Sequence, residues 1–452
     1  MSNHPSAVQP QAFVQWEENG LVHTALWQTE RGSAPPKRVV LADDTLSADT
    51  AYRLACEGTA LLWCSDFQNA RQLIQAMARR IEKNVEKKLS KKGKEAKRGA
   101  AKASASQDAD TNSKSEQLSP AHAFHAHRLA QLQRSKILSS VLIPLADDYT
   151  VPLRRAPDIQ EVCEQSWGPA SALHLPPVTI DPNAPPEEEK PYDAGMEAGS
   201  ASDQLNKPIR ILTPLREIQG LIGAYEWRRK GLEIPELGKP PYNRIHPYYG
   251  VYSPVRGEYL ELVAKAPIPQ VEGGVLAFDI GTGTGVLTAL LLHRGVLKVV
   301  ATETEDRALE CAAFNFENLQ CGSMVQLVKA DLFPEGKANL IVCNPPWIPA
   351  KASAPIERAV YDEGSHMLMG FINGLAQHLL PKGEGWLILS DIAEHLGLRT
   401  RDELLQAIDA AGLKLLGKSD IKPRHAKAID PSDPLHKARS KEVTSLWRLG
   451  VK

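Results

Sequence analysis

Residues 275–292, VLAFDIGTGTGVLTALLL, constrain the fold more than any other stretch of this 452-residue chain. The segment VLAFDI is typical of a buried strand, and the apolar run after the turn is typical of a helix. Three glycines between them allow left-handed backbone conformations and a close approach to the main chain. A strand followed at once by a helix predicts a β–α–β unit with parallel strands.

The same alternation continues along the C-terminal half of the chain. Strands are predicted at 275–280, 297–303, 324–329, 338–343, 385–391, 414–419 and 442–449. Helices are predicted at 284–294, 305–317, 364–380 and 400–411. This order predicts an α/β fold with a seven-stranded, doubly wound sheet covered on both faces. No helix separates the last two strands, so we expect one of them to be antiparallel.

The N-terminal part is predicted to form a separate α/β domain over residues 1–175, with substrate recognition as one possible role. Within it, Thr59–Cys64 reads as a strand and a helix begins near Phe67. An acidic, proline-rich linker is expected over residues 176–206, and residues 207–452 form the second domain.

Between Arg79 and Lys102 the chain has eleven Lys or Arg residues and three Glu residues. We expect a basic, disordered insert near residues 88–120. Two interpretations stay open: a solvated linker, or an electrostatic tether for RNA that neutralises phosphates. The net charge of −1 provides no global field that favours nucleic acid.

Several classes of protein are disfavoured by the composition. The six cysteines form no C-x-x-C pair, which predicts reduced thiols in a cytoplasmic protein. His122, His125 and His127 have no acidic or cysteine residue close by in sequence, so we expect no metal site. The first residues lack signal-peptide features, and no apolar run approaches the ~20 residues that span a membrane.

The glycine turn predicts a ligand site. Gly281, Gly283 and Gly285 follow the spacing G-x-G-x-G with Thr282 inside it, whereas a dinucleotide fingerprint would need its third glycine at Val286. The loop is therefore suited to an extended ligand lying against the backbone and departs from the pyrophosphate pattern.

Three acidic residues lie at or just beyond the ends of successive predicted strands. Asp279, just before the glycine loop, suits a cationic amino group. Glu303 has the offset that typically binds ribose hydroxyls, and Asp331 suits an adenine amino group. Together with the loop they predict a site for S-adenosylmethionine; the alternative is an ordinary strand–turn–helix with surface acids.

The stretch LIVCNPPWIP, residues 340–349, ends a predicted buried strand in a rigid corner. Pro345 and Pro346 cannot continue the strand, because each lacks an N–H and fixes φ. The corner therefore presents the amide of Asn344 and the indole of Trp347. A buried core indole is the alternative interpretation of Trp347.

These motifs resemble class I S-adenosylmethionine-dependent methyltransferases, and more narrowly the small-domain group that modifies exocyclic amines and amides. Residues 279–285, DIGTGTG, match the first motif of the family, and residues 344–347 match its (N/D)-P-P-(Y/F/W) motif. Residues 250–253, GVYS, are similar to the GVFS segment of the ribosomal-RNA guanine enzymes. The resemblance covers about residues 245–392.

The resemblance implies a catalytic role for the corner. The side-chain oxygen of Asn344, which also borders the cofactor, and the carbonyl of Pro345 would accept N–H bonds from the target nitrogen. Pro346 would keep that carbonyl in one direction, and Trp347 would stack the planar target. Aromatic residues at this place are more often Tyr or Phe in the family.

The segment around GVYS adds tentative substrate contacts at Tyr249, Tyr252 and Arg256. Aromatic side chains interleaved with arginines suit an unstacked base and its phosphates. They equally suit a packing layer between a helix and a loop.

Three functions stay open from sequence. The favoured one is methylation of an exocyclic amine of an RNA base, an rRNA or tRNA adenine or guanine. The second is methylation of a protein glutamine of the release-factor type. The third is a non-catalytic methyltransferase fold that binds RNA. The expected partner is thus nucleic acid or a protein substrate.

Overall fold

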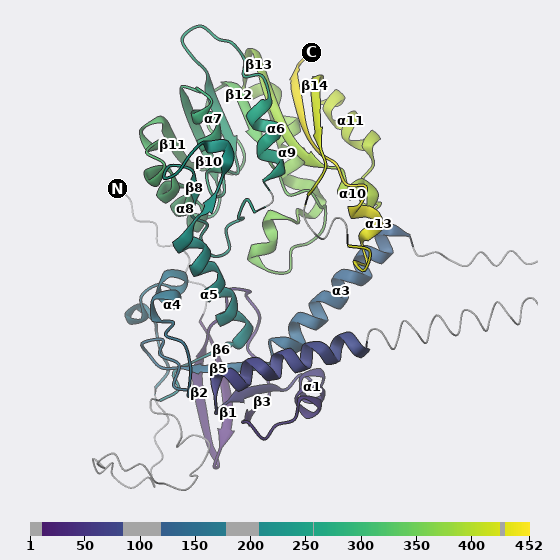
Figure 1. The fold of residues 1–452 in the computed structure, drawn as a ribbon. Coiled ribbons are helices and arrows are strands. Elements are labelled where there is room, and N and C mark those ends of the chain that lie inside the picture. The colour runs from purple at the N-terminus through teal and green to yellow at the C-terminus, as the bar shows by residue number, and fades with distance from the viewer. Residues whose placement is uncertain (1–10, 85–118, 178–207, 256, 425–429) are drawn as a thin grey trace, which may run out of the picture. The chain divides into compact units, whose positions relative to one another are not determined.

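The computed structural model describes residues 11–84, 119–177, 208–424 except 256, and 430–452 (Figure 1). The chain divides into two compact units. The first comprises Met1–Gln117 and Arg128–Ile222, and the second comprises Leu118–His127 and Gly223–Lys452. The predicted insert near 88–120 and linker at 176–206 fall almost entirely outside the described residues.

The first unit is built on a mixed six-stranded sheet in the order β1-β2-β6-β5-β4-β3. Its strands are β1 (Ala12–Glu18), β2 (Leu21–Trp27), β3 (Val39–Ala42), β4 (Ala60–Trp63), β5 (Val141–Leu145) and β6 (Ile211–Pro214). Helices are α1 (Ala48–Cys56), a helix described over residues 67–84, most of α3 (Pro120–Leu138), and α4 (Gln160–Trp167). The predicted strand at 59–64 and helix from Phe67 are therefore confirmed.

The strand β6 marks a difference from the expected domain boundary at residue 207. It pairs with β2 on one side and β5 on the other, inside the N-terminal sheet. The division of the chain between the two units falls between Ile222 and Gly223, within α5 (Leu215–Lys230). The reason is topological: a four-residue apolar strand carries no sequence mark of the sheet that it joins.

The second unit contains the seven-stranded sheet predicted from sequence, in the order β11-β10-β9-β12-β13-β15-β14. Its strands are β9 (Leu276–Ile280), β10 (Lys298–Glu303), β11 (Val325–Lys329), β12 (Ala338–Cys343), β13 (Leu379–Ser390), β14 (Leu413–Ile421) and β15 (Thr444–Val451). The strand β15 runs antiparallel to both of its neighbours, as expected for the final pair. The strand β13 starts six residues earlier than the prediction of 385.

Helices cover both faces of this sheet, which confirms the doubly wound prediction. One core packs α6 (Glu258–Lys265) and α7 (Val286–His293), and the other packs α9 (His366–His378) and α11 (Arg401–Ala410). Successive residues of β12 alternate between the two cores, Leu340 and Val342 in the first and Ile341 and Cys343 in the second. This alternation explains why the strand is apolar throughout.

The second unit has further helices and a short pair of strands. They are α8 (Asp306–Asn318), α10 (Ile392–His395), α13 (His436–Arg439) and the two-stranded pair β7 (Leu232–Glu233) and β8 (Arg244–Ile245). Within the part of the chain that the structure describes, no helix is both long and apolar enough to cross a membrane.

The register of the sheet sets where the motifs meet. Ile280 at the end of β9 is level with Thr302 of β10 and with Cys343 of β12. Glu303 is level with Lys329, the last residue of β11. The segments that follow these four strands therefore emerge at one edge, where open α/β sheets bind ligands.

Candidate functional site at the carboxyl edge of the C-terminal sheet

The glycine loop joins β9 to α7. Its backbone is packed against the core at Gly285 and is uncovered at Gly283. Gly281, Gly283 and Gly285 all have positive φ, of 71°, 55° and 82°. A Cβ at Gly285 would lie 2.5 Å from the ring of Phe316, a buried core residue. A Cβ at Gly283 would meet nothing within 4 Å. The backbone at Gly283 is therefore free for a ligand to approach.

Asp279 is fully buried directly before this loop. Its Oδ2 accepts hydrogen bonds from the hydroxyls of Thr282 and Thr288, each at 2.7 Å, and from the Thr288 N–H at 3.1 Å. Its Oδ1 has no partner among the described residues. Burial raises the pKa of Asp279 to about 6, against the lowering effect of those hydrogen bonds. One carboxylate oxygen is thus buried and available to a donor.

Thr282, predicted to touch the cofactor, is itself buried. Its hydroxyl donates to Asp279, and its N–H donates to the Thr302 carbonyl at 2.9 Å. These bonds tie the glycine loop to the ends of β9 and β10. Thr282 therefore shapes the loop and orients Asp279.

Glu303 reaches back from the end of β10 to the glycine loop. Its Oε2 accepts the Gly283 N–H at 3.1 Å, and its Oε1 accepts the Thr304 N–H at 2.8 Å. A carboxylate therefore lies beside the open face of Gly283. Asp331 is exposed two residues beyond the end of β11, at the same edge of the sheet.

The NPPW corner begins at the end of β12. Asn344 is partly buried and Pro345 is buried. The indole Nε1 of Trp347 donates a hydrogen bond of 3.0 Å to the Asn344 side-chain oxygen. The chain then folds back, since Ile348 forms a β-bridge with Tyr361. The corner is thus closed by its own indole and by the returning loop.

Trp347 is partly buried and packs against three separate apolar clusters of the second unit. This environment fits the alternative of a packed indole, and the remaining exposed part is what a stacking role would use. Its stacking on a planar target stays a prediction.

Tyr252 of the GVYS segment and Asp279 both act on the buried Tyr259. Burial raises the pKa of Tyr259 well above its ordinary value, and charge on Tyr252 and Asp279 adds to that rise. The Tyr249 carbonyl accepts a bond of 3.5 Å from Arg307. Arg256, the third tentative substrate residue, lies outside the described residues.

Sequence reasoning missed two residues on the side facing the glycine loop. The side chain of Met367 covers Gly281, where it would clash with any added Cβ. The Met367 N–H donates to Asp362 at 2.8 Å, and the charge of Asp362 adds to the burial that raises the pKa of Cys343. The only feature of the sequence that could have pointed to them is Asp362, an acidic residue shortly before the apolar helix α9.

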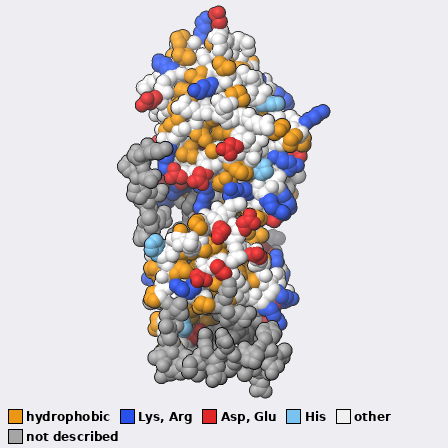
Figure 2. All heavy atoms as spheres, turned by 90° about the vertical axis from the view of Figure 1, so that its left-hand side faces the viewer, with side chains coloured by type: hydrophobic (Ala, Val, Ile, Leu, Met, Phe, Trp, Pro, Cys, Tyr) orange, Lys and Arg blue, Asp and Glu red, His pale blue; other side chains and the backbone are white. Residues whose placement is uncertain are grey.

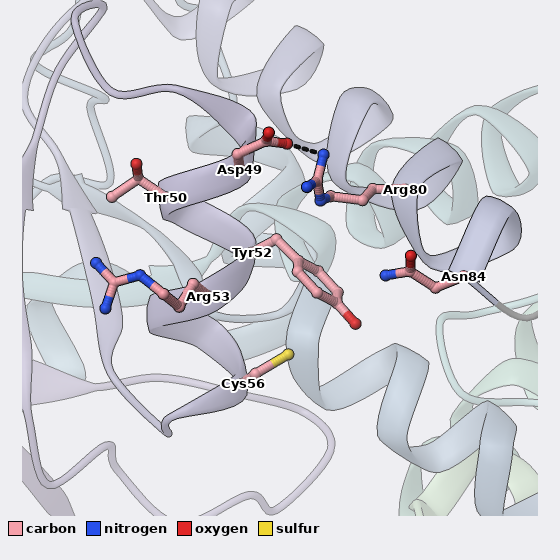
Figure 3. A pocket seen from close by; sticks show the side chains of 7 residues that line it. All are labelled: Asp49, Thr50, Tyr52, Arg53, Cys56, Arg80 and Asn84. Carbon is pink, nitrogen blue, oxygen red and sulfur yellow. Dashed lines mark ion pairs between the residues drawn. The ribbon is translucent and has the colours of Figure 1, made fainter.

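A hollow of about 470 Å³ lies elsewhere, in the first unit (Figure 3). Asp49 of α1 forms an ion pair with Arg80 at its rim. Its lining is Asp49, Thr50, Tyr52, Arg53, Cys56, Arg80 and Asn84. None of the motif residues lines this hollow, so it is separate from the site at the sheet edge.

Metal-ligating side chains do not gather in the described part of the chain: no group of three or more His, Cys, Asp or Glu residues there has a suitable arrangement. The histidines singled out from sequence lie on the first turns of α3. One of them, His122, contacts the hydroxyl of Ser119 at 3.2 Å.

Comparisons with known proteins match the same region. Residues 267–407 match the family model of the methyltransferase small domain. Over 135 aligned residues the chain is 37% identical to the release factor glutamine methyltransferase of Mycolicibacterium smegmatis. The alignment covers 28% of this chain and 46% of that protein. Over 162 aligned residues the chain is 26% identical to the tRNA1(Val) (adenine(37)-N6)-methyltransferase of Photobacterium profundum. That alignment covers 33% of this chain and 65% of the other protein.

Among solved structures, a methyltransferase from Pyrococcus furiosus aligns with 44% of this chain and 89% of its own, at 21% identity and a TM-score of 0.30. The chain thus spans less than two thirds of the length of the two curated relatives named above. The N-terminal unit lies outside the matched family region.

Proposed function

We propose that the protein is an S-adenosylmethionine-dependent N-methyltransferase, on the premise that residues 267–407 match the family model of the methyltransferase small domain and lie in a seven-stranded α/β sheet. Its target is a planar amine, most consistently the exocyclic amine of an RNA base, adenine or guanine in rRNA or tRNA.

One observation carries this proposal, namely the register between β9 and β12. Ile280 and Cys343 are paired neighbours, so the glycine loop and the NPPW corner both start from the same level of adjacent parallel strands. Adjacent strands are ~4.8 Å apart. A ligand on the glycine loop is therefore next to the amide of Asn344, as direct group transfer requires.

The residues of the loop fit S-adenosylmethionine. The unpartnered buried Oδ1 of Asp279 suits the ligand's ammonium group, because a buried acceptor without a donor costs ~1–3 kcal/mol. The open face of Gly283 suits the extended chain, and the adjacent Glu303 suits the ribose hydroxyls. Asp331 is assigned to the adenine amino group.

Bound S-adenosylmethionine supplies a methyl group activated by a positively charged sulfur. The corner acts on the target nitrogen, whose lone pair is delocalised into the adjacent π-system. Acceptors at the Asn344 side chain and the Pro345 carbonyl would hold its two N–H bonds and direct the lone pair toward the methyl group. Because Pro345 and Pro346 fix φ, that carbonyl is pre-oriented, which lowers the cost of alignment.

An RNA base is favoured as the target by three features. The corner carries the largest aromatic side chain, and stacking of a base on an aromatic side chain contributes ~1–3 kcal/mol. The GVYS segment carries aromatic residues that suit an unstacked base, and the sequence carries a run with eleven Lys or Arg residues between residues 79 and 102. On the face that Figure 2 shows, basic and acidic side chains of the described residues are interspersed.

Protein glutamine is the second candidate. It is favoured by the 37% identity to the release factor glutamine methyltransferase, the stronger of the two matches by identity. A glutamine side-chain amide presents the same planar N–H₂ group to Asn344 and Pro345. We assign the protein to the cytoplasm, in keeping with its free thiols, five of six of which are buried.

The test is incubation of the purified protein with labelled S-adenosylmethionine and extracts from cells that lack it. Label in RNA supports the first candidate, and label in a protein supports the second. Calorimetry with S-adenosylhomocysteine distinguishes both from a non-catalytic fold, which would take up neither the label nor the ligand.

A further inference from the structure

Trp347 makes a contact that neither stacking nor core packing requires. Its indole N–H points at the Asn344 side chain, with 3.0 Å between Nε1 and Oδ1. An indole nitrogen can only donate a hydrogen bond. The amide atom that faces it must therefore be the oxygen, which fixes the orientation of the Asn344 amide.

That orientation matters because an asparagine amide has two unlike ends. Rotation about its terminal torsion is broad and roughly two-fold, so the oxygen and the NH₂ group can exchange places. Only the oxygen can accept an N–H bond from a target amine. A reversed amide would present its own N–H bonds to that amine and repel it.

We propose that Trp347 is a positioning residue that acts through Asn344: the indole holds the amide with its oxygen at the corner. One lone pair of Oδ1 takes the indole N–H, and the second lone pair remains for the target nitrogen. This inference rests on the proposed function, and it gives Trp347 a role additional to stacking.

The surroundings of the indole suit such a role. Trp347 packs against the cores on both faces of the sheet and against a third cluster. The members of the third cluster are Phe124, Ile392, Leu396, Leu435 and Ala438. Packing on several sides fixes the orientation of the indole ring and therefore the direction of its N–H. A fixed N–H can select one orientation of the Asn344 amide.

The same reasoning explains the departure from the commoner Tyr or Phe at this position. Phenylalanine has no donor, and the hydroxyl of tyrosine lies at the far end of the ring rather than beside the main chain. Of these three aromatic residues, tryptophan alone combines a flat face with an N–H on the flank of the ring.

The test is a double-mutant cycle on methyl transfer. Trp347→Phe keeps a flat ring but loses the donor, and we expect kcat to fall about five- to tenfold with KM changed less than twofold. Asn344→Asp presents oxygen in either orientation, as in family members with aspartate at this place. In that background, Trp347→Phe should lower kcat less than about twofold. An equal loss in both backgrounds overturns the inference.

A readout that needs no substrate separates this inference from the proposed function. In a ¹H–¹⁵N spectrum of the full-length protein, Asn344→Ala should shift the Trp347 indole signal and leave the Trp386 indole signal in place. Trp386 is a matched control, because its Nε1 donates to Glu384 at 3.1 Å and not to a residue of the corner. An unmoved Trp347 signal overturns the hydrogen bond.

Trp386→Phe serves as the control for packing in the kinetic cycle, since Trp386 is fully buried in the same core. It should lower the melting temperature and leave kcat of the folded enzyme near wild type. Failure to bind S-adenosylhomocysteine would overturn the proposed function, whereas the indole signal tests the Trp347–Asn344 bond in either case.

Discussion

Lowering the pH should weaken binding of S-adenosylhomocysteine through Asp279. The carboxyl of Asp279 is fully buried, and burial raises its pKa to about 6. If its unpartnered oxygen receives the ammonium group of the ligand, binding requires the ionised form. Protonation below pH 6 removes the negative charge and therefore the attraction.

The magnitude follows from the pKa. At pH 8 nearly every Asp279 carboxyl is ionised, whereas at pH 5 a group with a pKa of about 6 is ionised in roughly one molecule of eleven. The dissociation constant should therefore rise about tenfold between pH 8 and pH 5, or ~1.4 kcal/mol. Because binding of the cation stabilises the carboxylate, the ligand should also release a proton to solution when it binds near pH 6.

The assay is isothermal titration calorimetry from pH 8 to pH 5 in buffers of different ionisation enthalpy, which reports both affinity and proton release. The matched ligand is 5′-methylthioadenosine, which shares the nucleoside but lacks the amino-acid group. Its affinity should not follow the pKa of Asp279. The matched variant is Asp279→Asn, which should bind S-adenosylhomocysteine weakly and without the pH dependence.

Two outcomes would refute this reasoning. Equal pH dependence for the two ligands would mean that the ammonium group is not held by Asp279. An Asp279→Asn variant with the wild-type pH profile would mean that another group titrates. For the stability of the ligand-free protein, the effect of pH has the opposite sign to its effect on binding. Because folding raises the pKa of Asp279, the unfolding free energy falls as pH rises from about 4 to 6. The Asp279→Asn variant should lack that dependence on pH.

Four further changes test the corner, the glycine loop and the basic run. Asn344→Ala should abolish methyl transfer while S-adenosylhomocysteine binds with near wild-type affinity; retained turnover would exclude the proposed role of the corner. Both glycines have positive φ, so alanine strains the backbone at either place, but only the Cβ of Gly285→Ala would also clash with Phe316, at 2.5 Å. Gly285→Ala should therefore lower the melting temperature more than Gly283→Ala, which should also weaken ligand binding. Equal thermal losses would argue against an open face at Gly283. Deletion of residues 85–118 should reduce RNA affinity and its dependence on salt, since fewer phosphates would be neutralised; an unchanged slope would leave that segment a linker.

The C-terminal fold was predictable because its signals are local. Most of its strands are apolar runs, helices of clear periodicity lie between several of them, and the α/β alternation leaves few ways to build the sheet. The glycine loop and the NPPW corner were placed together by the same rule, since both follow parallel strands. The antiparallel pairing of β15 followed from the missing helix.

What the sequence could not provide depends on contacts between distant segments. The strand β6 joins the N-terminal sheet through backbone pairing that leaves no pattern in its four residues. Met367 covers Gly281 only because α9 packs against the sheet. The bond from Trp347 to Asn344 depends on rotamers, which neither composition nor spacing specifies.

The central claim is that the corner at Asn344 methylates the amine of an RNA base, and nucleoside mass spectrometry tests it most directly. RNA is compared among cells that lack the protein and cells that regain either the wild type or Asn344→Ala. We predict that one N-methylated adenosine or guanosine disappears without the protein and returns only with the wild type. An unchanged set of RNA nucleosides, together with a methylglutamine that depends on Asn344, would contradict the claim.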